Sequence, residues 1–165
     1  MSIFPKRIVS GENVIIHLRF INSKKNNRLI KYFLNVYNPK KKLIYNFSDD
    51  IILGYGNNYY NEKYHSLMIQ NDFIPGKYIV NFYMEVNGKK VDSLTKQNDY
   101  FHVEKIDFYK NNNDIILKNM SNEITKCILY GNNKEEIVLE GNETKRVNDE
   151  YQYIEYGNNQ IFKIE

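Results

Sequence analysis

The sequence has no alanine, no tryptophan and a single cysteine in 165 residues. A chain without alanine, the residue of highest helix propensity, is not expected to be rich in helix. The lone Cys127 cannot form an internal disulfide, and its place in the apolar run EITKCILY favours a buried, unreactive thiol over a reactive one. Asparagine, lysine, isoleucine and tyrosine are abundant instead, which is the composition expected of an AT-rich genome.

A strong net charge and long apolar segments are also missing. The 23 Lys and Arg residues against 20 Asp and Glu residues give a net charge of +3, which does not predict the clustered basic face of a nucleic-acid-binding protein. We interpret the Lys-rich stretches at 23–28, 39–42 and 88–90 as solvated turns, with a phosphate-binding patch as the alternative. Because no segment resembles a leader peptide or a membrane span, we expect a cytoplasmic protein.

The spacings of the common catalytic and metal sites do not occur. His17, His65 and His102 fall in three separate predicted strands, and there is no Cys pair and no His-Glu-x-x-His motif. Neither a Gly-x-Ser-x-Gly nucleophile turn nor a phosphate-binding loop is present. The adjacent Asp49 and Asp50 would point to opposite sides of a strand, so we assign them to a turn. We therefore predict a protein that is not an enzyme and that has no cofactor and no metal.

What the sequence does contain is short runs in which apolar residues recur with a period of two. In the run 77–86, Tyr78, Val80 and Phe82 alternate with residues that include Asn81 and Tyr83, as in a half-buried strand. Turn signals separate such runs at intervals of about 8–12 residues. We predict strands near 6–9, 13–21, 29–37, 42–47, 64–70, 77–86 and 98–104, with Leu18, Phe20, Val80 and Phe82 in the core.

The number and spacing of these strands predict an all-β fold in which residues 1–104 form an immunoglobulin-like antiparallel β-sandwich. The pattern changes after Glu104, where the polar segment YKNNND (109–114) is followed by shorter apolar runs. We assign residues 105–165 to a smaller all-β domain. Its core would be marginal by itself, so we expect it to pack against the first domain.

The tetrapeptide Tyr-Gly-Asn-Asn occurs three times, at 55–58, 130–133 and 156–159. The second and third copies stand between predicted strands, and Gly and Asn tolerate the positive φ angles of tight hairpin loops. The first copy begins a longer loop. No metal or phosphate chemistry requires Gly-Asn-Asn at this spacing, so we interpret the repeat as turns. The Asn-Gly pair at 87–88 likewise predicts a two-residue hairpin turn.

One surface of the predicted sandwich has the residue types of a binding site. In an immunoglobulin-like fold the third, sixth and seventh strands lie side by side in one sheet, and their outward positions here combine aromatic rings with amide and charged groups. Such rings can stack on a sugar while the polar groups bind its hydroxyls. Alternatively, the second domain or a partner covers this surface. The candidate ligand-binding residues are Phe33, Asn35, Tyr37, Asn81, Tyr83, Glu85, Tyr100 and His102, beside Lys31 and Glu104.

Short motifs within residues 4–104 resemble those of known families. Gly-Glu at 11–12 opens the second strand, Pro-Gly-Lys-Tyr at 75–78 follows a long loop, and Phe-His-Val at 101–103 lies in the closing strand. In this order they resemble the carbohydrate-binding C-terminal domain of O-antigen ABC-transporter ATPases, which implies a sandwich fold and a glycan ligand. Lys-Leu-Ile-Tyr at 42–45, with the later Pro-Gly-x-Tyr strand, also resembles the intracellular subtilisin-inhibitor family. Neither resemblance covers the second domain.

These observations predict a non-catalytic binding module that recognises a glycan or a similar ligand on the outer face of one sheet. The alternative is a protein–protein interaction module, such as a protease inhibitor or an assembly component of a virion or an appendage. Unpaired sheet edges would then accept a strand from a partner, and they would also permit oligomers.

Overall fold

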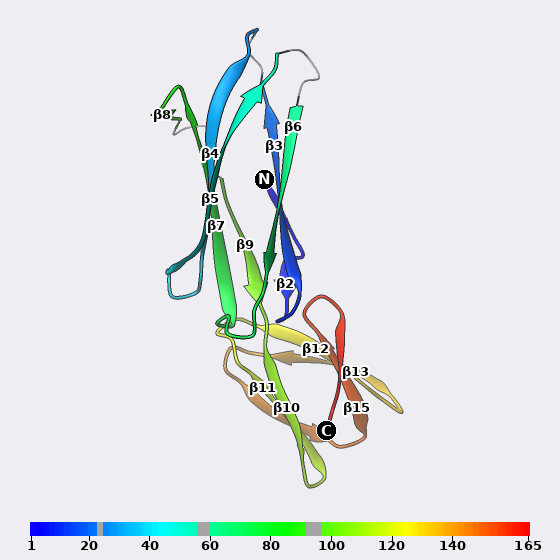
Figure 1. The fold of residues 1–165 in the computed structure, drawn as a ribbon. Helices are drawn as coiled ribbons and strands as arrows, with labels where there is room; N and C mark the ends of the chain where they lie inside the picture. The colour runs from blue at the N-terminus through cyan, green and yellow to red at the C-terminus, as the bar shows by residue number, and fades with distance from the viewer. Residues whose placement is uncertain (23–24, 56–59, 92–96) are drawn as a thin grey trace. The chain divides into compact units, whose positions relative to one another are not determined.

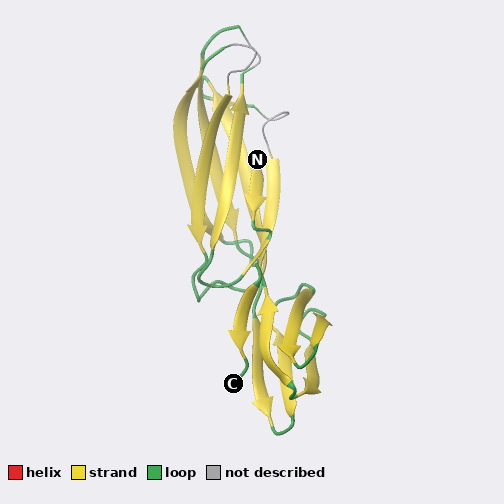
Figure 2. Cartoon of the chain, turned by 90° about the vertical axis from the view of Figure 1, so that its right-hand side faces the viewer, coloured by secondary structure: helices red, strands yellow, loops and turns green. Residues whose placement is uncertain are grey.

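A computed structural model describes the chain except for residues 23–24, 56–59 and 92–96. The described residues form strands and no helix, which confirms the all-β prediction (Figures 1 and 2). They divide into two compact units. The first comprises Met1–Lys6, Val14–Leu67 and Tyr78–Phe101, and the second comprises Arg7–Asn13, Met68–Lys77 and His102–Glu165.

Two sheets build the first unit. One has the strand order β1-β3-β6, and the other has the order β2-β9-β7-β4-β5, with β8 paired to β7. The division between the units passes through β7 and β9, and it places β2 in the second unit. The strand bounds are β1 Ser2–Phe4, β2 Arg7–Ile8, β3 Asn13–Ile21, β4 Arg28–Tyr37, β5 Leu43–Leu53, β6 Tyr60–Met68, β7 Gly76–Val86, β8 Lys89–Lys90 and β9 Gln97–Val103.

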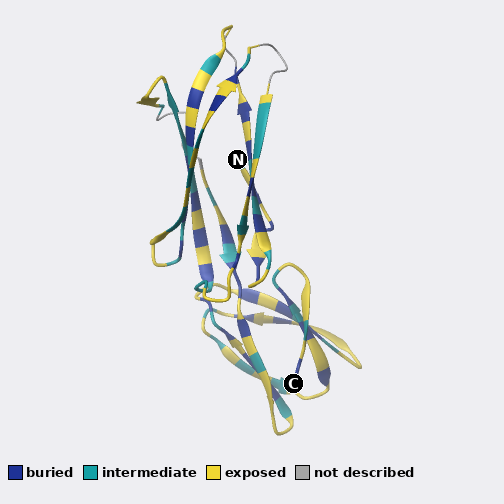
Figure 3. Ribbon diagram, in the orientation of Figure 1, coloured by how far each residue is buried: buried dark blue, intermediate teal, exposed yellow. Residues whose placement is uncertain are grey.

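The period-two alternation determines which side of each strand is buried (Figure 3). Phe20 of β3 lies across from Tyr32 of β4 and Phe82 of β7, with ring centroids 5.2 Å and 5.8 Å apart. The exposed fractions of the predicted core residues are 1% for Leu18, 3% for Phe20, 0% for Val80 and 6% for Phe82, so the assignment of strand faces is confirmed. Two sheets therefore share one core, an arrangement that fits the predicted immunoglobulin-like sandwich.

The structure corrects the prediction for Asp49 and Asp50. Strand β5 continues to Leu53 instead of ending at residue 47, so both carboxylates lie within a strand and not in a turn. Asp50 lies on the solvated side of the strand, whereas Asp49 lies on the side of the buried Ile51 and Leu53. Asp49 forms an ion pair with Lys63 of β6, with Nζ and Oδ2 3.3 Å apart. This partner lies on another strand of the fold, so the local pattern around the two aspartates does not reveal it.

The second unit is also a two-sheet structure. Its sheets have the orders β10-β11-β14 and β13-β12-β15-β16, and the described pairings are antiparallel. Burial raises the pKa of the Cys127 thiol to about 12, which agrees with an unreactive cysteine. The core residues are Val9, Ile106, Ile115, Leu117, Cys127, Leu129, Ile137, Leu139, Tyr151, Ile154, Tyr156 and Ile164. The bounds are β10 Ile106–Asn111, β11 Asp114–Asn119, β12 Thr125–Gly131, β13 Lys134–Leu139, β14 Thr144–Asn148, β15 Tyr151–Tyr156 and β16 Gln160–Lys163.

Two copies of Tyr-Gly-Asn-Asn form the hairpin turns that the sequence predicts. The copy at 130–133 joins β12 to β13, and the copy at 156–159 joins β15 to β16. In the latter, Gly157 and Asn159 have φ angles of 69° and 60°, which Gly and Asn adopt readily. The first copy lies outside the described residues from position 56 onward. The predicted Asn-Gly turn between β7 and β8 is confirmed by positive φ angles at both residues.

Candidate functional site

The three strands chosen from the sequence lie side by side, in the order β9-β7-β4. Their register sets Phe33 opposite Tyr83 and Asn35 opposite Asn81, so four candidate residues form two adjacent cross-strand pairs. The residues Phe33, Asn35, Tyr37, Asn81, Tyr83, Glu85 and Tyr100, which belong to the first unit, are called the predicted face below.

The two central rings of the predicted face contact each other. Phe33 and Tyr83 are stacked, with centroids 4.5 Å apart and 8° between the ring planes. The Nζ atom of Lys31 lies 5.6 Å from the Phe33 centroid, and that of Lys90 lies 5.0 Å from the Tyr83 centroid. Each ring therefore has a cation within the range of a cation–π interaction. A sugar stacks on an open ring face, whereas these rings contact each other and lysine side chains.

The amides of the predicted face continue a ladder that begins on β5. Asn46 of β5 donates a hydrogen bond from Nδ2 to Oδ1 of Asn35, at 2.6 Å, and Asn81 is next in register. The Oδ1 atom of Asn81 is buried and accepts no hydrogen bond from the described residues. Buried polar atoms normally have a partner, so this oxygen is an unsatisfied group beneath the surface of the predicted face.

The other candidate residues are not part of these two pairs. Tyr100 is 43% exposed, and Lys6 Nζ lies 5.3 Å from its ring centroid. Tyr37 is half-buried at the end of β4, and Glu85 is half-buried on β7. His102 falls in the second unit, where burial lowers the pKa of its imidazole. The register thus places Tyr37 and Glu85 on the same side of the sheet as the two central pairs, whereas His102 is assigned to the other unit.

Glu104 lies on a buried side of the chain, contrary to the outward position assigned from the sequence. Its carboxylate pairs with the guanidinium of Arg7 and accepts a hydrogen bond from the backbone N–H of Gly157 at 3.0 Å. Burial raises the pKa of this carboxyl, and the Arg7 charge opposes that shift. Glu104 therefore links the β2 segment to the β15–β16 turn within the second unit.

The outer side of the other sheet, β1-β3-β6, exposes more aromatic and apolar surface than the predicted face. The exposed fractions are 70% for Phe4, 71% for Ile21, 53% for Tyr60 and 65% for Tyr64. These residues come from all three strands of the sheet. The set Phe4, His17, Arg19, Ile21, Tyr60, Glu62 and Tyr64 is called the exposed face below.

Contacts within the exposed face hold its larger side chains in place. The rings of His17 and Tyr64 are stacked, with centroids 4.6 Å apart and 9° between planes. The Arg19 guanidinium carbon lies 4.5 Å from the Tyr60 centroid. Oε1 of Glu62 lies 3.5 Å from His17 Nε2 and 3.8 Å from Arg19 Nε. One carboxylate is therefore shared by the two stacked pairs.

Sequence reasoning missed the exposed face because two of its strands were not recognised in full. Strand β1 has only three residues, which is too short for a periodic pattern. Strand β6 begins at Tyr60, while the alternation had predicted a start near residue 64. The alternating residues Tyr60, Glu62 and Tyr64 in YYNEKYHSLM were the available signal.

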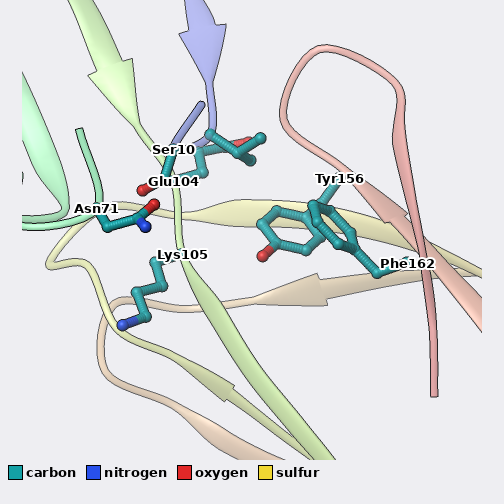
Figure 4. Close-up of a pocket in the computed structure, with 7 residues that line it drawn as sticks. Ser10, Asn71, Glu104, Lys105, Tyr156 and Phe162 are labelled. Carbon is teal, nitrogen blue, oxygen red and sulfur yellow. The ribbon is translucent and has the colours of Figure 1, made fainter. Parts of the chain in front are cut away.

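The second unit contains a cavity of about 210 Å³ (Figure 4). Both carboxylate oxygens of its buried glutamate already have partners, and the side chains of Ser10, Asn71 and Lys105 are exposed. The cavity therefore lacks the converging polar groups that fix a small molecule in a specific site. In Figure 4 the stacked rings of Tyr156 and Phe162 lie apart from these polar lining residues.

Two further kinds of feature do not occur in the part of the chain that the structure describes. There, no group of three or more His, Cys, Asp or Glu side chains is placed to hold a metal ion. Nor do these residues include a helix that is long and apolar enough to cross a membrane.

Comparison with known proteins adds a weak similarity. No protein-family model and no curated protein matches the chain. Among solved structures, it is similar to a chain from work on a chaperone–tip adhesin complex in the biogenesis of CFA/I fimbriae, with 14% identity and a TM-score of 0.30. The match covers 99% of this chain and 98% of the other. An identity and a TM-score at this level assign neither a fold nor a function.

Proposed function

We propose that the chain is a non-catalytic module that binds a protein partner on the exposed face. The observation that carries this proposal is the exposure of Phe4, Ile21, Tyr60 and Tyr64 on one side of a three-stranded sheet. Contiguous apolar surface on a folded domain marks an interaction site more often than scattered exposed residues do. Tyrosine and arginine, both present here, supply a large share of binding energy in protein interfaces.

The internal contacts of the exposed face also favour binding. Immobilising a flexible side chain on association costs about 0.5–1.5 kcal/mol. His17 is already stacked on Tyr64, and Arg19 already lies over Tyr60, so part of this ordering is present in the free protein. Phe4 and Ile21 add apolar surface that a partner would remove from water.

Glycan recognition on the predicted face is the second candidate function. The observation that favours it is the 43% exposed ring of Tyr100. The stacking of Phe33 on Tyr83 weighs against it, because those ring faces are in contact with each other. The rings of the exposed face are already open to solvent, with Tyr60 53% and Tyr64 65% exposed, and we therefore rank the protein-binding proposal first.

Site-specific photo-crosslinking tests the first proposal. A photoreactive amino acid replaces Tyr64 in the full chain, and the matched control carries it at Tyr109, a 52% exposed tyrosine of β10. We expect a discrete adduct with one protein of the source cells at position 64 and not at position 109. We also expect Phe4→Ala combined with Arg19→Ala to remove that adduct. The same adducts at both positions, or none at position 64, would contradict the proposal.

A glycan array separates the two candidate functions. The wild-type chain, Tyr64→Ala and Tyr100→Ala are applied to the same array. Binding of a glycan that survives Tyr64→Ala and is lost in Tyr100→Ala would favour the second candidate. Under the first proposal no glycan is bound by any of the three proteins.

A further inference from the structure

Strand β5 is a long edge strand of the first unit. It pairs with β4 on one side, and no other strand of the described residues pairs with it. Beyond a bulge at Ile44, residues 45–53 therefore present a regular row of backbone N–H and C=O groups without a strand partner. Such a row is a template for another strand.

Natural edge strands are usually protected by lysine, proline, bulges or short length. The other described edge strands longer than three residues, β6, β10, β13, β14 and β16, each contain Lys or Arg. Strand β5, with the sequence LIYNFSDDIIL, contains no Lys, Arg, Pro or Gly, and the register shift in its pairing with β4 leaves Ile44 as an extra residue near its start. Its two acidic residues, Asp49 and Asp50, are its only charged groups, so their environment decides whether a second strand can approach.

We propose that the β5 edge pairs with β5 of a second copy of this chain, antiparallel about a two-fold axis at Ser48. A two-fold interface must be self-complementary, because each residue meets the counterpart of its own partner. The regular part of β5 meets this condition, since Ser48 is the central residue of the segment 45–51 and the apolar Tyr45 and Ile51 at its ends face each other. In the regular part of the strand, after the bulge at Ile44, the resulting pairs are Tyr45 with Ile51, Asn46 with Asp50, and Phe47 with Asp49.

The acidic residues are compatible with this register. Asp49 would lie opposite Phe47 of the second copy, and its charge is already paired with Lys63 of its own chain at 3.3 Å. Asp50 would lie opposite Asn46, and it stands beside Lys31 in the register with β4. No carboxylate is placed directly opposite another, which is the arrangement that destabilises cross-strand pairs.

The C-terminal end of β5 offers fewer free backbone groups to a second strand than the centre does. The carbonyl of Leu53 accepts a hydrogen bond from Nδ2 of Asn22 at 3.2 Å, so that group is already in use. The contact is one strand wide, whereas stable dimers usually bury about 1,600 Å² in total. We therefore expect a weak, concentration-dependent dimer. Because the edge is separate from the exposed face, this inference does not depend on the proposed partner.

Cysteine cross-linking tests the register directly. Directly opposed residues of an antiparallel pair have Cα atoms about 4.5–5.5 Å apart, which a disulfide spans. Under a mild oxidant Ser48→Cys should form a disulfide-linked dimer, whereas Ser66→Cys, an exposed serine of β6, should not. Asn46→Cys should cross-link in a mixture with Asp50→Cys but not with itself. The native Cys127 is buried.

Sedimentation analysis over a range of concentrations supplies the second measurement. Ser48→Lys places two like charges opposite each other at the axis, and we expect it to raise the dimer dissociation constant by about tenfold or more. An unchanged melting temperature shows that the fold is intact, since Ser48 is exposed.

Three outcomes would overturn the proposal. One is a wild-type chain that stays monomeric at every concentration. Another is cross-linking of Ser48→Cys that is no faster than cross-linking of Ser66→Cys. The third is an adduct of the Ser48→Cys variant with a different protein and no homodimer, which would indicate strand addition by a partner.

Discussion

The two sheets of the first unit carry similar residue types on their outer sides but arrange them differently. On the predicted face, Phe33 and Tyr83 stand directly opposite each other on β4 and β7 and stack at 4.5 Å. On the exposed face, Phe4 stands opposite Ile15 and its ring remains 70% exposed. Stacking alone does not close a ring to a ligand, because Tyr64 stacks on His17 at 4.6 Å and is still 65% exposed. The two faces therefore differ in how far their rings are buried.

This difference separates two uses of aromatic residues. A ring stacked on its cross-strand neighbour stabilises the sheet, and such a pair contributes about 0.5–1.5 kcal/mol beyond its buried area. A ring that remains largely exposed contributes little to folding but offers surface to a partner, and Tyr64 is such a ring even though it stacks on His17. Variants that change stability should therefore lie in the core and on the predicted face, and variants that change binding should lie on the exposed face.

The largest effect is expected in the core that both sheets share. Phe82→Ala and Leu18→Ala should each lower the free energy of unfolding by about 2–5 kcal/mol, because each leaves a cavity among packed side chains. Urea denaturation measures the change, and Ile21→Ala, at a 71% exposed position of β3, is the control. A loss below about 0.5 kcal/mol in both core variants would mean that the two sheets do not share this core.

A smaller effect is expected for the stacked pair of the predicted face. Tyr83→Ala should lower the free energy of unfolding by roughly 1–2 kcal/mol, since a half-buried ring loses its contact with Phe33. A double-mutant cycle with Phe33→Ala should give a coupling energy of about 0.5–1.5 kcal/mol. Additive effects of the two substitutions would show that the stack does not form in solution. The ring faces of Phe33 and Tyr83 would then be open to a glycan, which would favour the second candidate function.

The sequence was sufficient to predict the strands whose alternation is long. Strands β3, β4 and β7 have nine or more residues each, and their buried sides follow the apolar positions. The neighbour relation β9-β7-β4 also followed from the strand count, because sandwich topology limits the order of strands in a sheet. These are consequences of patterns within a strand or of general rules of topology.

Features that depend on distant partners could not be predicted in the same way. Phe4 and Tyr64 are sixty positions apart in the sequence, and only the pairing of β1 and β6 with β3 places them on one face. The acidic pair at 49–50 looked like a turn because Lys63, which neutralises Asp49, lies outside any local window. The stacking of Phe33 on Tyr83 requires the register between two strands, which the alternation of each strand does not contain.

Acidic pH should weaken the first unit through the inner side of β6. Burial, reinforced by the Lys63 charge and opposed by Asp49, lowers the pKa of His65 below its ordinary 6.5. Well above pH 6.5, His65 is neutral in both the folded and the unfolded protein. It therefore adds no pH dependence to the free energy of unfolding in that range. As the pH falls below about 6.5, the unfolded chain takes up the proton first, and the free energy of unfolding decreases. The decrease continues until the lowered pKa of the folded protein is passed.

Thermal melts between pH 7.5 and pH 5 measure this effect. The wild-type melting temperature should fall on acidification, and His65→Phe, which keeps a ring beside Phe47, should fall less steeply. The half-buried His102 has a lowered pKa as well, so part of the pH dependence should remain in this variant. Equal slopes for the wild type and His65→Phe would remove His65 as a source of the pH dependence.

The smallest change in stability is expected where the largest change in binding is expected. Tyr64 is 65% exposed, so Tyr64→Ala should alter the free energy of unfolding by no more than about 0.5 kcal/mol despite the loss of the stack on His17. Truncation of a central aromatic residue of an interface commonly costs about 2 kcal/mol or more, so affinity for the cross-linked partner should fall by roughly thirtyfold. Urea denaturation and titration of the partner measure the two quantities on one protein. Tyr83→Ala should show the reverse, with reduced stability and unchanged affinity. If Tyr64→Ala instead destabilises the fold as much as Tyr83→Ala does, the two outer faces do not differ in kind, and the exposed face is part of the scaffold and not a binding surface.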